Sequence, residues 1–295
     1  MFAGVVATAA FPAALAWVFT HPPRRLHRRT PRGAGIAFER VRLRTADGLR
    51  LSAWYVPADP GRGSLPKGVV VICHGYYGNR ATMLPYLAFL YRAGYSALLF
   101  DFRAHGWSGG RMATFGVKET LDLQAALDWT QTRPELEGLP VAVLGESMGA
   151  SVALLLAAED ARVRAVVADS AFARFDSAVE GRLRLAFGPR LASVLVPRTR
   201  NVGERLLGIR CVDIAPVDAI ARIAPRPVLL IHGTGDALIA RENSHRLFEA
   251  APGNALLWEV PGAGHVGSVY VAGDEYARRV TAFLGDALAG GGGGA

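Results

Sequence analysis

Apolar runs of strand length alternate with helix-length segments along most of this chain. The strand-like runs cover residues 69–73, 96–101, 141–144, 163–168, 227–231 and 255–260, and the helix-length segments cover 81–93, 117–132, 148–159, 241–251 and 270–288. Strands that alternate with helices are typical of a parallel sheet with helices on both faces. The pattern therefore predicts an α/β fold built on a mostly parallel, doubly wound sheet.

A hairpin pattern precedes this alternation. Residues 36–44 and 49–56 flank Ala46-Asp47-Gly48, and an Asp-Gly pair is typical of a tight turn between antiparallel strands. We expect two antiparallel edge strands here. A chain of 295 residues with 51% hydrophobic content can bury one large core. We therefore predict a single catalytic domain over residues 36–288.

One connection in this domain is unusually long. More than fifty residues separate the strand that ends near Asp169 from the strand that starts at Pro227, far more than ordinary connections use. An inserted helical cap at about 172–225 is the expected explanation. A four-residue spacing predicts helical structure in it, through Leu183, Phe187, Leu191 and Leu195. Gly188-Pro189 is expected to divide this segment into two short helices.

The amino terminus is apolar and is followed by basic residues. No charged side chain occurs from Phe2 to Thr20, and with Met1 this stretch would form about 30 Å of helix, enough to cross a bilayer. Five arginines follow before the first acidic residue: Arg24, Arg25, Arg28, Arg29 and Arg32. Such residues favour the cytoplasmic side of a membrane. We therefore interpret residues 1–20 as a transmembrane anchor, 21–35 as a basic linker, and the catalytic domain as cytoplasmic.

Two other interpretations of residues 1–20 stay open. A signal peptide cleaved near Ala14-Leu15-Ala16 would export the domain, although its apolar segment would be preceded only by the positive charge of the terminal amine. A helix that packs on the domain is the other alternative. At the opposite end, residues 289–295 contain the run Gly290 to Gly294 and are expected to form a flexible tail.

Basic charge also gathers in the expected cap. The formal net charge is +8, and eight arginines lie between Phe172 and Val212: Arg174, Arg182, Arg184, Arg190, Arg198, Arg200, Arg205 and Arg210. A solvated basic surface is the ordinary interpretation, and contact with anionic lipid headgroups is the alternative. Nucleic-acid binding has no support beyond the net charge. Cys73 and Cys211 are too few for a disulfide framework.

The strongest chemical signal is the motif Gly145-Glu146-Ser147-Met148-Gly149. It lies between an apolar strand and a helix of small residues, which is the context of a nucleophile elbow. Glycines permit the sharp turn that exposes the serine hydroxyl, so Ser147 is the candidate nucleophile. Gly106-Trp107-Ser108-Gly109-Gly110 has the same spacing, but no strand or helix adjoins it directly. We therefore interpret Ser108 as a loop serine.

A serine nucleophile needs a base, and the base needs an acid to orient it. Asp236 follows the strand at 227–231, and His265 follows the strand at 255–260. Loops that follow parallel strands meet at one edge of the sheet, so Ser147, Asp236 and His265 can converge. The other candidate acids are Asp213, Asp218 and Asp274.

An acyl-transfer site also needs donors for the tetrahedral oxyanion. The backbone N–H of Met148, which follows the nucleophile, is one candidate. The other is the backbone N–H of Tyr76, in the loop after the strand at 69–73. His74 and Gly75 belong to the same loop and are expected to support it.

Several of these motifs together resemble the α/β-hydrolase superfamily. They are the His74-Gly75 turn, residues 101–109, the elbow at Ser147, residues 233–236 and Gly262-Ala263-Gly264-His265. The chain looks most similar to the bacterial serine-aminopeptidase-like and Bem46-like serine hydrolases. The resemblance implies a Ser-Asp-His triad, no metal and no organic cofactor. The family loop often reads Arg-Gly-His-Gly, and Ala104 replaces its first glycine here.

These observations predict a serine hydrolase that cleaves a carboxylic ester with a lipophilic or medium-sized acyl part. A peptidase or a thioesterase would use the same triad, and a non-catalytic binding protein of this fold is a further alternative. The expected partners are a small-molecule ester or acyl substrate and, through residues 1–20, a membrane. The oligomeric state stays open. Ser147 argues against dehalogenases and epoxide hydrolases of this fold, which need a carboxylate at the elbow.

Overall fold

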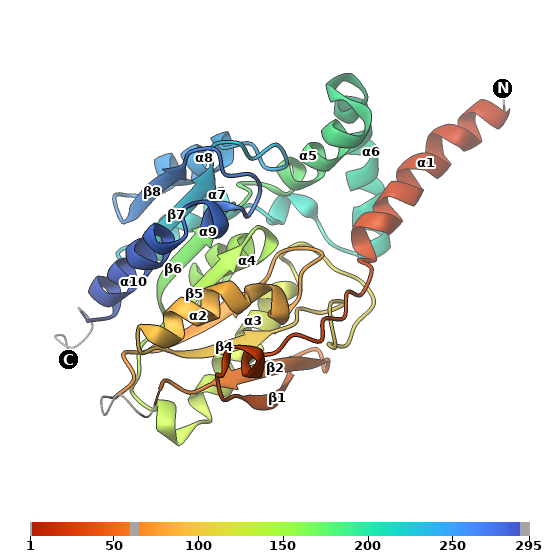
Figure 1. Ribbon diagram of the computed structural model, residues 1–295. Coiled ribbons are helices and arrows are strands. Elements are labelled where there is room, and N and C mark those ends of the chain that lie inside the picture. Colours follow the sequence, from red (N-terminus) through yellow and green to blue (C-terminus); the bar gives the residue numbers. More distant parts are fainter. Residues whose placement is uncertain (1, 60–64, 290–295) are drawn as a thin grey trace.

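A computed structural model describes residues 2–59 and 65–289 of the chain (Figure 1). Its centre is one eight-stranded sheet in the order β1-β2-β4-β3-β5-β6-β7-β8. The strands are β1 (Glu39–Arg44), β2 (Arg50–Val56), β3 (Val69–Cys73), β4 (Ser96–Phe100), β5 (Val141–Glu146), β6 (Val163–Asp169), β7 (Val228–Gly233) and β8 (Ala255–Val260). The strands from β4 to β8 pair in parallel. The prediction of a mostly parallel sheet is confirmed.

The predicted hairpin also forms, with one difference. β1 and β2 pair in an antiparallel ladder, and β1 is the edge strand. β2 is not an edge strand, because its other side pairs with β4, also antiparallel. The burial of β2 fits this internal place, since every residue from Leu51 to Val56 is buried.

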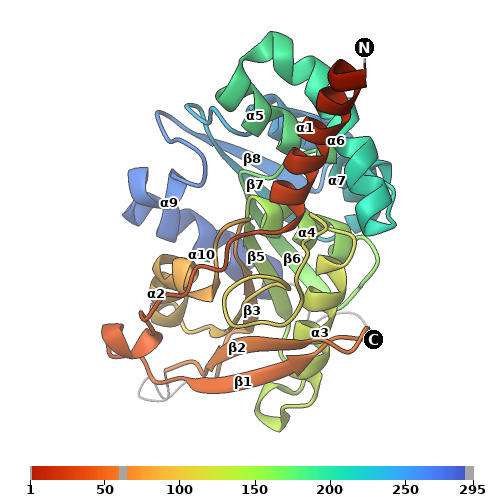
Figure 2. The same cartoon turned by 90° about the vertical axis from the view of Figure 1, so that its right-hand side faces the viewer.

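Helices cover both faces of the sheet (Figures 1 and 2). One face carries α2 (Leu84–Arg92), α9 (Ser268–Val271) and α10 (Asp274–Ala289), and the other carries α3 (Glu119–Gln131), α4 (Met148–Ala157), α7 (Pro216–Ala219) and α8 (Glu242–Ala250). Short 3-10 turns occur as η1 (Pro31–Ala34), η3 (Arg80–Met83), η4 (Pro134–Leu136), η5 (Cys211–Asp213) and η6 (Ile220–Ile223). This arrangement explains why the central strands are continuously apolar.

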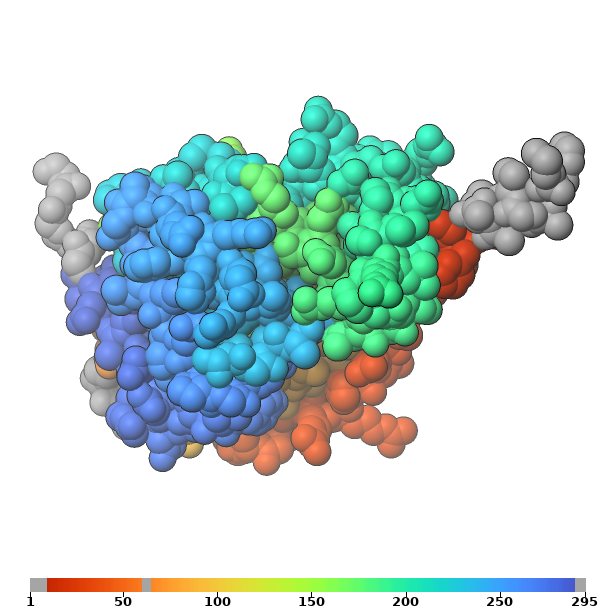
Figure 3. Space-filling view, turned by 90° about the horizontal axis from the view of Figure 1, so that it is seen from above, coloured from red at the N-terminus to blue at the C-terminus, as the bar shows by residue number. Residues whose placement is uncertain are grey.

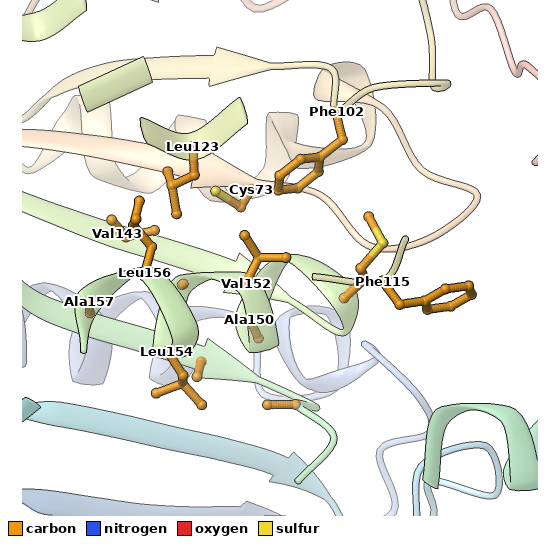
Figure 4. Close-up of a cluster of buried hydrophobic side chains, with 14 of the residues drawn as sticks. Cys73, Phe102, Phe115, Leu123, Val143, Ala150, Val152, Leu154, Leu156 and Ala157 are labelled. Atoms are coloured by element: carbon orange, nitrogen blue, oxygen red, sulfur yellow. The ribbon is translucent and has the colours of Figure 1, made fainter. Parts of the chain in front are cut away.

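Side chains of β3 divide between the two faces. Val71 and Cys73 pack in the core on the α4 side, whereas Val70 and Ile72 pack in the core on the α2 and α10 side. In the first core, Cys73 and Val143 of neighbouring strands lie beside Val152 of α4 and Leu123 of α3 (Figure 4). Strand β3, which leads into the loop of Gly75 and Tyr76, is thus anchored on both faces.

Two long helices occupy the segment in which the cap was expected. They are α5 (Phe175–Phe187) and α6 (Pro189–Leu207), which we call the cap helices. Gly188, with a φ of 78°, separates them, and Pro189 begins α6. The division at Gly188-Pro189 is as predicted, but α6 is a helix of 19 residues rather than a short one. Pro197 lies inside it.

Helix α1 (Phe2–Thr20) lies beside α6 in both ribbon views (Figures 1 and 2). Ala16 and Phe19 are buried, and the Phe11 ring meets the Phe187 ring of α5 edge-on, with centroids 5.6 Å apart. From above, the red α1 borders the green cap helices (Figure 3). One side of its carboxyl end therefore packs on protein, whereas Trp17 and Val18 are exposed.

No helix within residues 2–59 and 65–289 is both long and apolar enough to span a lipid bilayer. The predicted transmembrane anchor at residues 1–20, and with it the predicted membrane partner, is therefore not supported. Met1 and most of the expected tail, residues 290–295, lie outside the described residues.

A buried ion-pair network joins three segments that are far apart in the sequence. The Arg103 guanidinium contacts Asp122 of α3 at 2.6 Å and Asp47 of the hairpin turn at 2.8 Å. The side chains of Arg103 and Asp122 are 2% and 0% exposed. Removing Arg103 would leave Asp122 buried without its counter-charge.

We expect Arg103→Met to lower the free energy of unfolding by about 3 to 5 kcal/mol, because Asp122 would lose its counter-charge inside the core. Urea denaturation followed by circular dichroism measures this. Arg222→Met is the control, since its ion pair with Glu159 is exposed and should contribute under about 1 kcal/mol. Equal losses in the two variants would contradict a special role for the buried pair.

Candidate active site

Ser147 forms a sharp turn between β5 and α4. Its φ of 51° and ψ of −115° lie where residues other than glycine are rarely found, at a cost of about 1 to 3 kcal/mol. Two backbone hydrogen bonds hold it there: its N–H donates to Asp169 O at 2.8 Å, and its carbonyl accepts from Ser151 N at 3.1 Å. The turn raises the hydroxyl above the carboxyl end of β5.

The glycines beside this turn are required by close packing. A Cβ on Gly145 would lie 2.4 Å from the Gly149 carbonyl carbon. A Cβ on Gly149 would lie 2.4 Å from the Cys73 oxygen at the end of β3. The elbow therefore depends on β3 and β5 being neighbours and on α4 starting directly against both.

The structure brings Ser147, His265 and Asp236 together. His265 Nε2 lies 2.9 Å from Ser147 Oγ, and His265 Nδ1 lies 2.7 Å from Asp236 Oδ2. Asp236 follows β7, and His265 lies in the loop after β8. Ser147 and His265 are 118 positions apart in the chain, so their meeting is a product of the sheet topology. Within residues 2–59 and 65–289, His265 forms no hydrogen bond or ion pair with the other candidate acids, Asp213, Asp218 and Asp274.

Asp236 is arranged to carry a negative charge. Its Oδ1 accepts the backbone N–H groups of Leu238 and Ile239 at 2.9 and 2.8 Å. Burial alone would raise the pKa of Asp236, but the hydrogen bonds to His232 and His265 outweigh it and hold this pKa well below its usual value. A carboxylate in this state can orient the imidazole ring of His265 through the hydrogen bond to Nδ1.

His232, which was not among the predicted site residues, lies directly behind this pair. Its Nε2 is 2.8 Å from Ile239 O and 3.4 Å from Asp236 Oδ2, and its side chain is fully buried. Within the described part of the chain, its Nδ1 has no hydrogen-bond partner. The four-residue spacing from His232 to Asp236 is the sequence signal that could have pointed to it.

The two expected oxyanion donors are the backbone N–H groups of Met148 and Tyr76. The N–H of Met148 is the first of α4, where helix amides lack internal acceptors. Across residues 2–59 and 65–289, no protein acceptor takes the N–H of Met148 or of Tyr76. Gly75 approaches the nucleophile so closely that a Cβ on it would lie 3.2 Å from the Ser147 Cβ.

His74 ties this loop to its neighbour. Its Nδ1 is 2.7 Å from Gly75 O, and its Nε2 accepts the N–H of Phe102 at 3.0 Å. Burial lowers the pKa of His74 well below its usual value, so the ring is neutral. Ser108, in the rival serine motif, accepts the N–H of Ser52 and donates to Asp101 O, away from the triad. Ala104 adopts the left-handed φ of 61° that a glycine would favour.

Two buried carboxyl groups flank the elbow, and neither was predicted as part of the site. Glu146 accepts from Tyr86 OH at 3.2 Å and from Gly75 N at 3.3 Å, and Asp169 accepts from Tyr276 OH at 3.0 Å. Burial raises the pKa of Glu146 to about 7 and that of Asp169 to about 6. An acidic residue at the end of an apolar strand is the signal that marks both.

A cavity of about 510 Å³ opens beside Ser147 and His265. Its other lining residues come from α1, the Gly75 loop, β5, α5 and the loops around the triad: Leu15, Phe19, Gly75, Tyr76, Tyr77, Glu146, Arg182, Leu183, Ala186, Phe187, Leu238 and Val266. Most of these side chains are apolar or aromatic, which is typical of small-molecule sites. No group of three or more His, Cys, Asp or Glu side chains within the described ranges is arranged to hold a metal ion.

Comparison with known proteins decides the family. The sequence model of a family described as serine aminopeptidase, S33, matches residues 64–222. The chain belongs to this family of α/β-hydrolases. A Bacillus subtilis protein, YqkD, is 32% identical over 218 residues, which are 73% of this chain and 70% of that protein. A Mycobacterium tuberculosis relative is 32% identical over 226 residues, or 76% of this chain and 71% of the relative. Both relatives are named as uncharacterized proteins.

Among solved structures, an esterase of Pyrococcus furiosus, Pf2001, resembles this chain along nearly its whole length. The TM-score is 0.76 at 31% identity, and the match covers 92% of this chain and 98% of the esterase. The family and these neighbours identify the protein as an α/β-hydrolase enzyme, in agreement with the resemblance seen in the sequence motifs.

The raised pKa of Glu146 predicts a specific pH dependence of stability. The carboxyl is protonated in the folded state up to about pH 7, whereas its usual pKa is 4.5, so its contribution to stability is lost as pH rises through this range. We expect Glu146→Gln to gain stability relative to the wild type between these pH values, by roughly 3 kcal/mol at most. Urea denaturation at several pH values measures the difference. A difference that does not change with pH would contradict the buried state of Glu146.

Proposed function

We propose that this enzyme is a serine hydrolase that cleaves a carboxylic ester with Ser147, His265 and Asp236 as its triad. The observation that carries the proposal is the unbroken hydrogen-bond chain from Asp236 through His265 to Ser147, at the wall of an apolar cavity. The esterase name of the Pyrococcus furiosus neighbour supports the reaction class. We further propose residues 36–288 as the catalytic domain, with an inserted cap at about 172–225.

The geometry suggests the order of proton transfers. His265 Nε2 takes the proton of Ser147 Oγ while the oxygen bonds to the ester carbonyl carbon, and Asp236 stabilises the resulting imidazolium. The carbonyl oxygen becomes an oxyanion that accepts from the N–H groups of Tyr76 and Met148. As this intermediate collapses, the imidazolium protonates the departing alcohol, and an acyl-enzyme remains.

The second half of the reaction repeats these roles with water. His265 takes a proton from water as the water oxygen attacks the acyl carbon. The new tetrahedral intermediate collapses, the Ser147 oxygen leaves and recovers the proton, and the carboxylic acid is released. Ser147 and His265 return to their starting protonation states. Asp236 keeps its charge throughout, which agrees with its strongly lowered pKa.

The cavity favours an apolar, medium-sized acyl group. Leu15 and Phe19 of α1 line it on one side, and Leu183 and Phe187 of α5 line it on another. The family description adds a second candidate, which is the release of an amino-terminal residue from a peptide. The same triad would serve this reaction, so a test panel needs aminoacyl amides as well as esters.

Labelling with a fluorophosphonate tests the nucleophile. We expect Ser147→Ala to lose labelling and to lose about a million-fold of the turnover of a para-nitrophenyl ester, because no other hydroxyl receives help from His265. Gel fluorescence and hydrolysis assays measure the two effects. Ser108→Ala is the matched control, since it removes the serine of the other Gly-x-Ser-x-Gly motif and should keep the label. Labelling that survives in Ser147→Ala would move the nucleophile elsewhere.

The wall formed by α1 predicts acyl-chain selectivity. We expect Phe19→Ala to raise the ratio of kcat/KM for octanoate to that for butyrate esters by about tenfold, because the lost ring makes room for roughly two more buried methylenes. A panel of para-nitrophenyl esters measures this ratio. Phe11→Ala is the control, since Phe11 lies on the same helix but does not line the cavity. An unchanged ratio in Phe19→Ala would show that α1 does not bound the acyl site.

A further inference from the structure

Two arginine side chains meet the same tyrosine ring at the cavity wall. The guanidinium carbon of Arg182, from α5, lies 5.9 Å from the centroid of the Tyr77 ring, and that of Arg25, from the segment after α1, lies 5.6 Å from it. Arg182 also lies 5.2 Å from the Tyr76 ring centroid. Segments far apart in the sequence thus bring two positive charges to one place.

Neither charge is balanced by a carboxylate. Across the described residues, no Asp or Glu forms an ion pair with Arg25 or Arg182. Arg182 donates one hydrogen bond, to Ala178 O at 3.0 Å. Two other arginines have more polar partners: Arg200 forms an ion pair with Asp176, and Arg24 donates hydrogen bonds to three backbone carbonyls.

The one carboxyl among the lining residues of the cavity does not serve these arginines. Glu146 instead accepts from Gly75 N and Tyr86 OH. Arg182 is partly buried, and burial lowers the pKa of its guanidinium because water is removed from the charge. An unpaired charge in such surroundings is costly unless a counter-ion arrives.

The backbone also holds Tyr77 in an unusual conformation. Its φ is 68°, in the left-handed region that aromatic residues rarely occupy. Such a conformation costs of order 1 kcal/mol or more and persists only where the surroundings enforce it. Here the ring lies within cation–π distance of both guanidinium groups, one residue beyond the expected oxyanion donor Tyr76.

We propose that Arg182 and Arg25, set around Tyr77, bind an anionic group of the substrate, so that the enzyme prefers esters bearing a carboxylate or a phosphate. Arg182 and Tyr77 line the same cavity as Ser147 and His265, so one molecule can reach both the nucleophile and the arginines. Guanidinium groups bind such anions through charge-assisted, often bidentate hydrogen bonds. This inference rests on the proposed ester hydrolysis and names its substrate class.

Matched esters test this preference. The neutral substrate is para-nitrophenyl pentanoate, and the anionic ones are the mono-para-nitrophenyl ester of glutaric acid and the para-nitrophenyl ester of a phosphono acid of the same chain length. A second set places the carboxylate on the phenol instead. We expect the wild type to prefer at least one anionic ester, and Arg182→Met to lower the anionic-to-neutral ratio of kcat/KM by about tenfold or more. Arg25→Met should lower it less, because Arg25 is exposed.

The control is Arg184→Met, which removes an exposed charge from the same helix outside this cavity and should leave the ratio unchanged. If Arg182 only clamps the cap to the tyrosines, Arg182→Met will weaken hydrolysis of neutral and anionic esters equally. That result would overturn the proposal, as would a wild type that hydrolyses the neutral ester but prefers no anionic ester. Hydrolysis of the neutral ester that depends on Ser147 would still uphold the proposed function.

Binding measured without turnover tests the anion site separately from the proposed ester hydrolysis. Calorimetric titration of Ser147→Ala with the glutaric half-ester should show binding that weakens by about tenfold when Arg182→Met is added. If no ester is hydrolysed but this binding is seen, the ester-cleaving function fails and the anion site stands. If Ser147→Ala binds the half-ester, the phosphono ester and the neutral ester equally, the anion site fails.

Discussion

The backbone turn at Ser147 is the constraint on which the rest of the site depends. Ser147 adopts a positive φ there although it is not glycine. The close packing of β5, α4 and the end of β3 holds the backbone in this conformation. Gly149 packs against the Cys73 carbonyl, and Gly75 approaches the serine itself. The same contacts that force the turn bring the loop of Tyr76 beside the hydroxyl. Strain at the nucleophile and the expected oxyanion donors therefore have one structural origin.

Electrostatics around this turn follow from burial. Asp236 stays ionised because backbone N–H groups and two imidazoles surround it, whereas Glu146 and Asp169, with hydroxyl partners, resist ionisation. The three carboxyl groups around the nucleophile thus have very different proton affinities. Of these three carboxyl groups, Asp236 is the one that hydrogen-bonds to His265, so the one with the lowest pKa is the one that can stabilise an imidazolium.

Helix α1 is an apolar stretch that packs on other parts of the protein, although its hydropathy predicted a membrane anchor. Hydropathy describes how strongly a segment avoids water. It does not tell whether the segment is buried in a bilayer or against a protein surface. From Phe11 onward α1 packs on the cap helices and contacts Tyr76 in the loop after β3, and Leu15 and Phe19 line the cavity. A segment expected to serve only for attachment therefore becomes part of the wall around the site. A local sequence pattern could not identify the packing partners of α1, such as Tyr76, because they lie more than fifty residues away in the chain.

Local patterns by themselves determined the strands, most helices, the elbow and the order of serine, acid and histidine, because periodicity and turn chemistry act between near neighbours in the chain. The meeting of Ser147 with Asp236 and His265 could be expected from parallel topology, but their distances could not. Four features were decided only by the tertiary structure: the neighbours of His232, the buried state of Glu146, the place of α1, and the approach of Arg25 and Arg182 to the same Tyr77 ring. Each of these depends on which distant surfaces exclude water together, and burial of that kind is a property of the assembled fold.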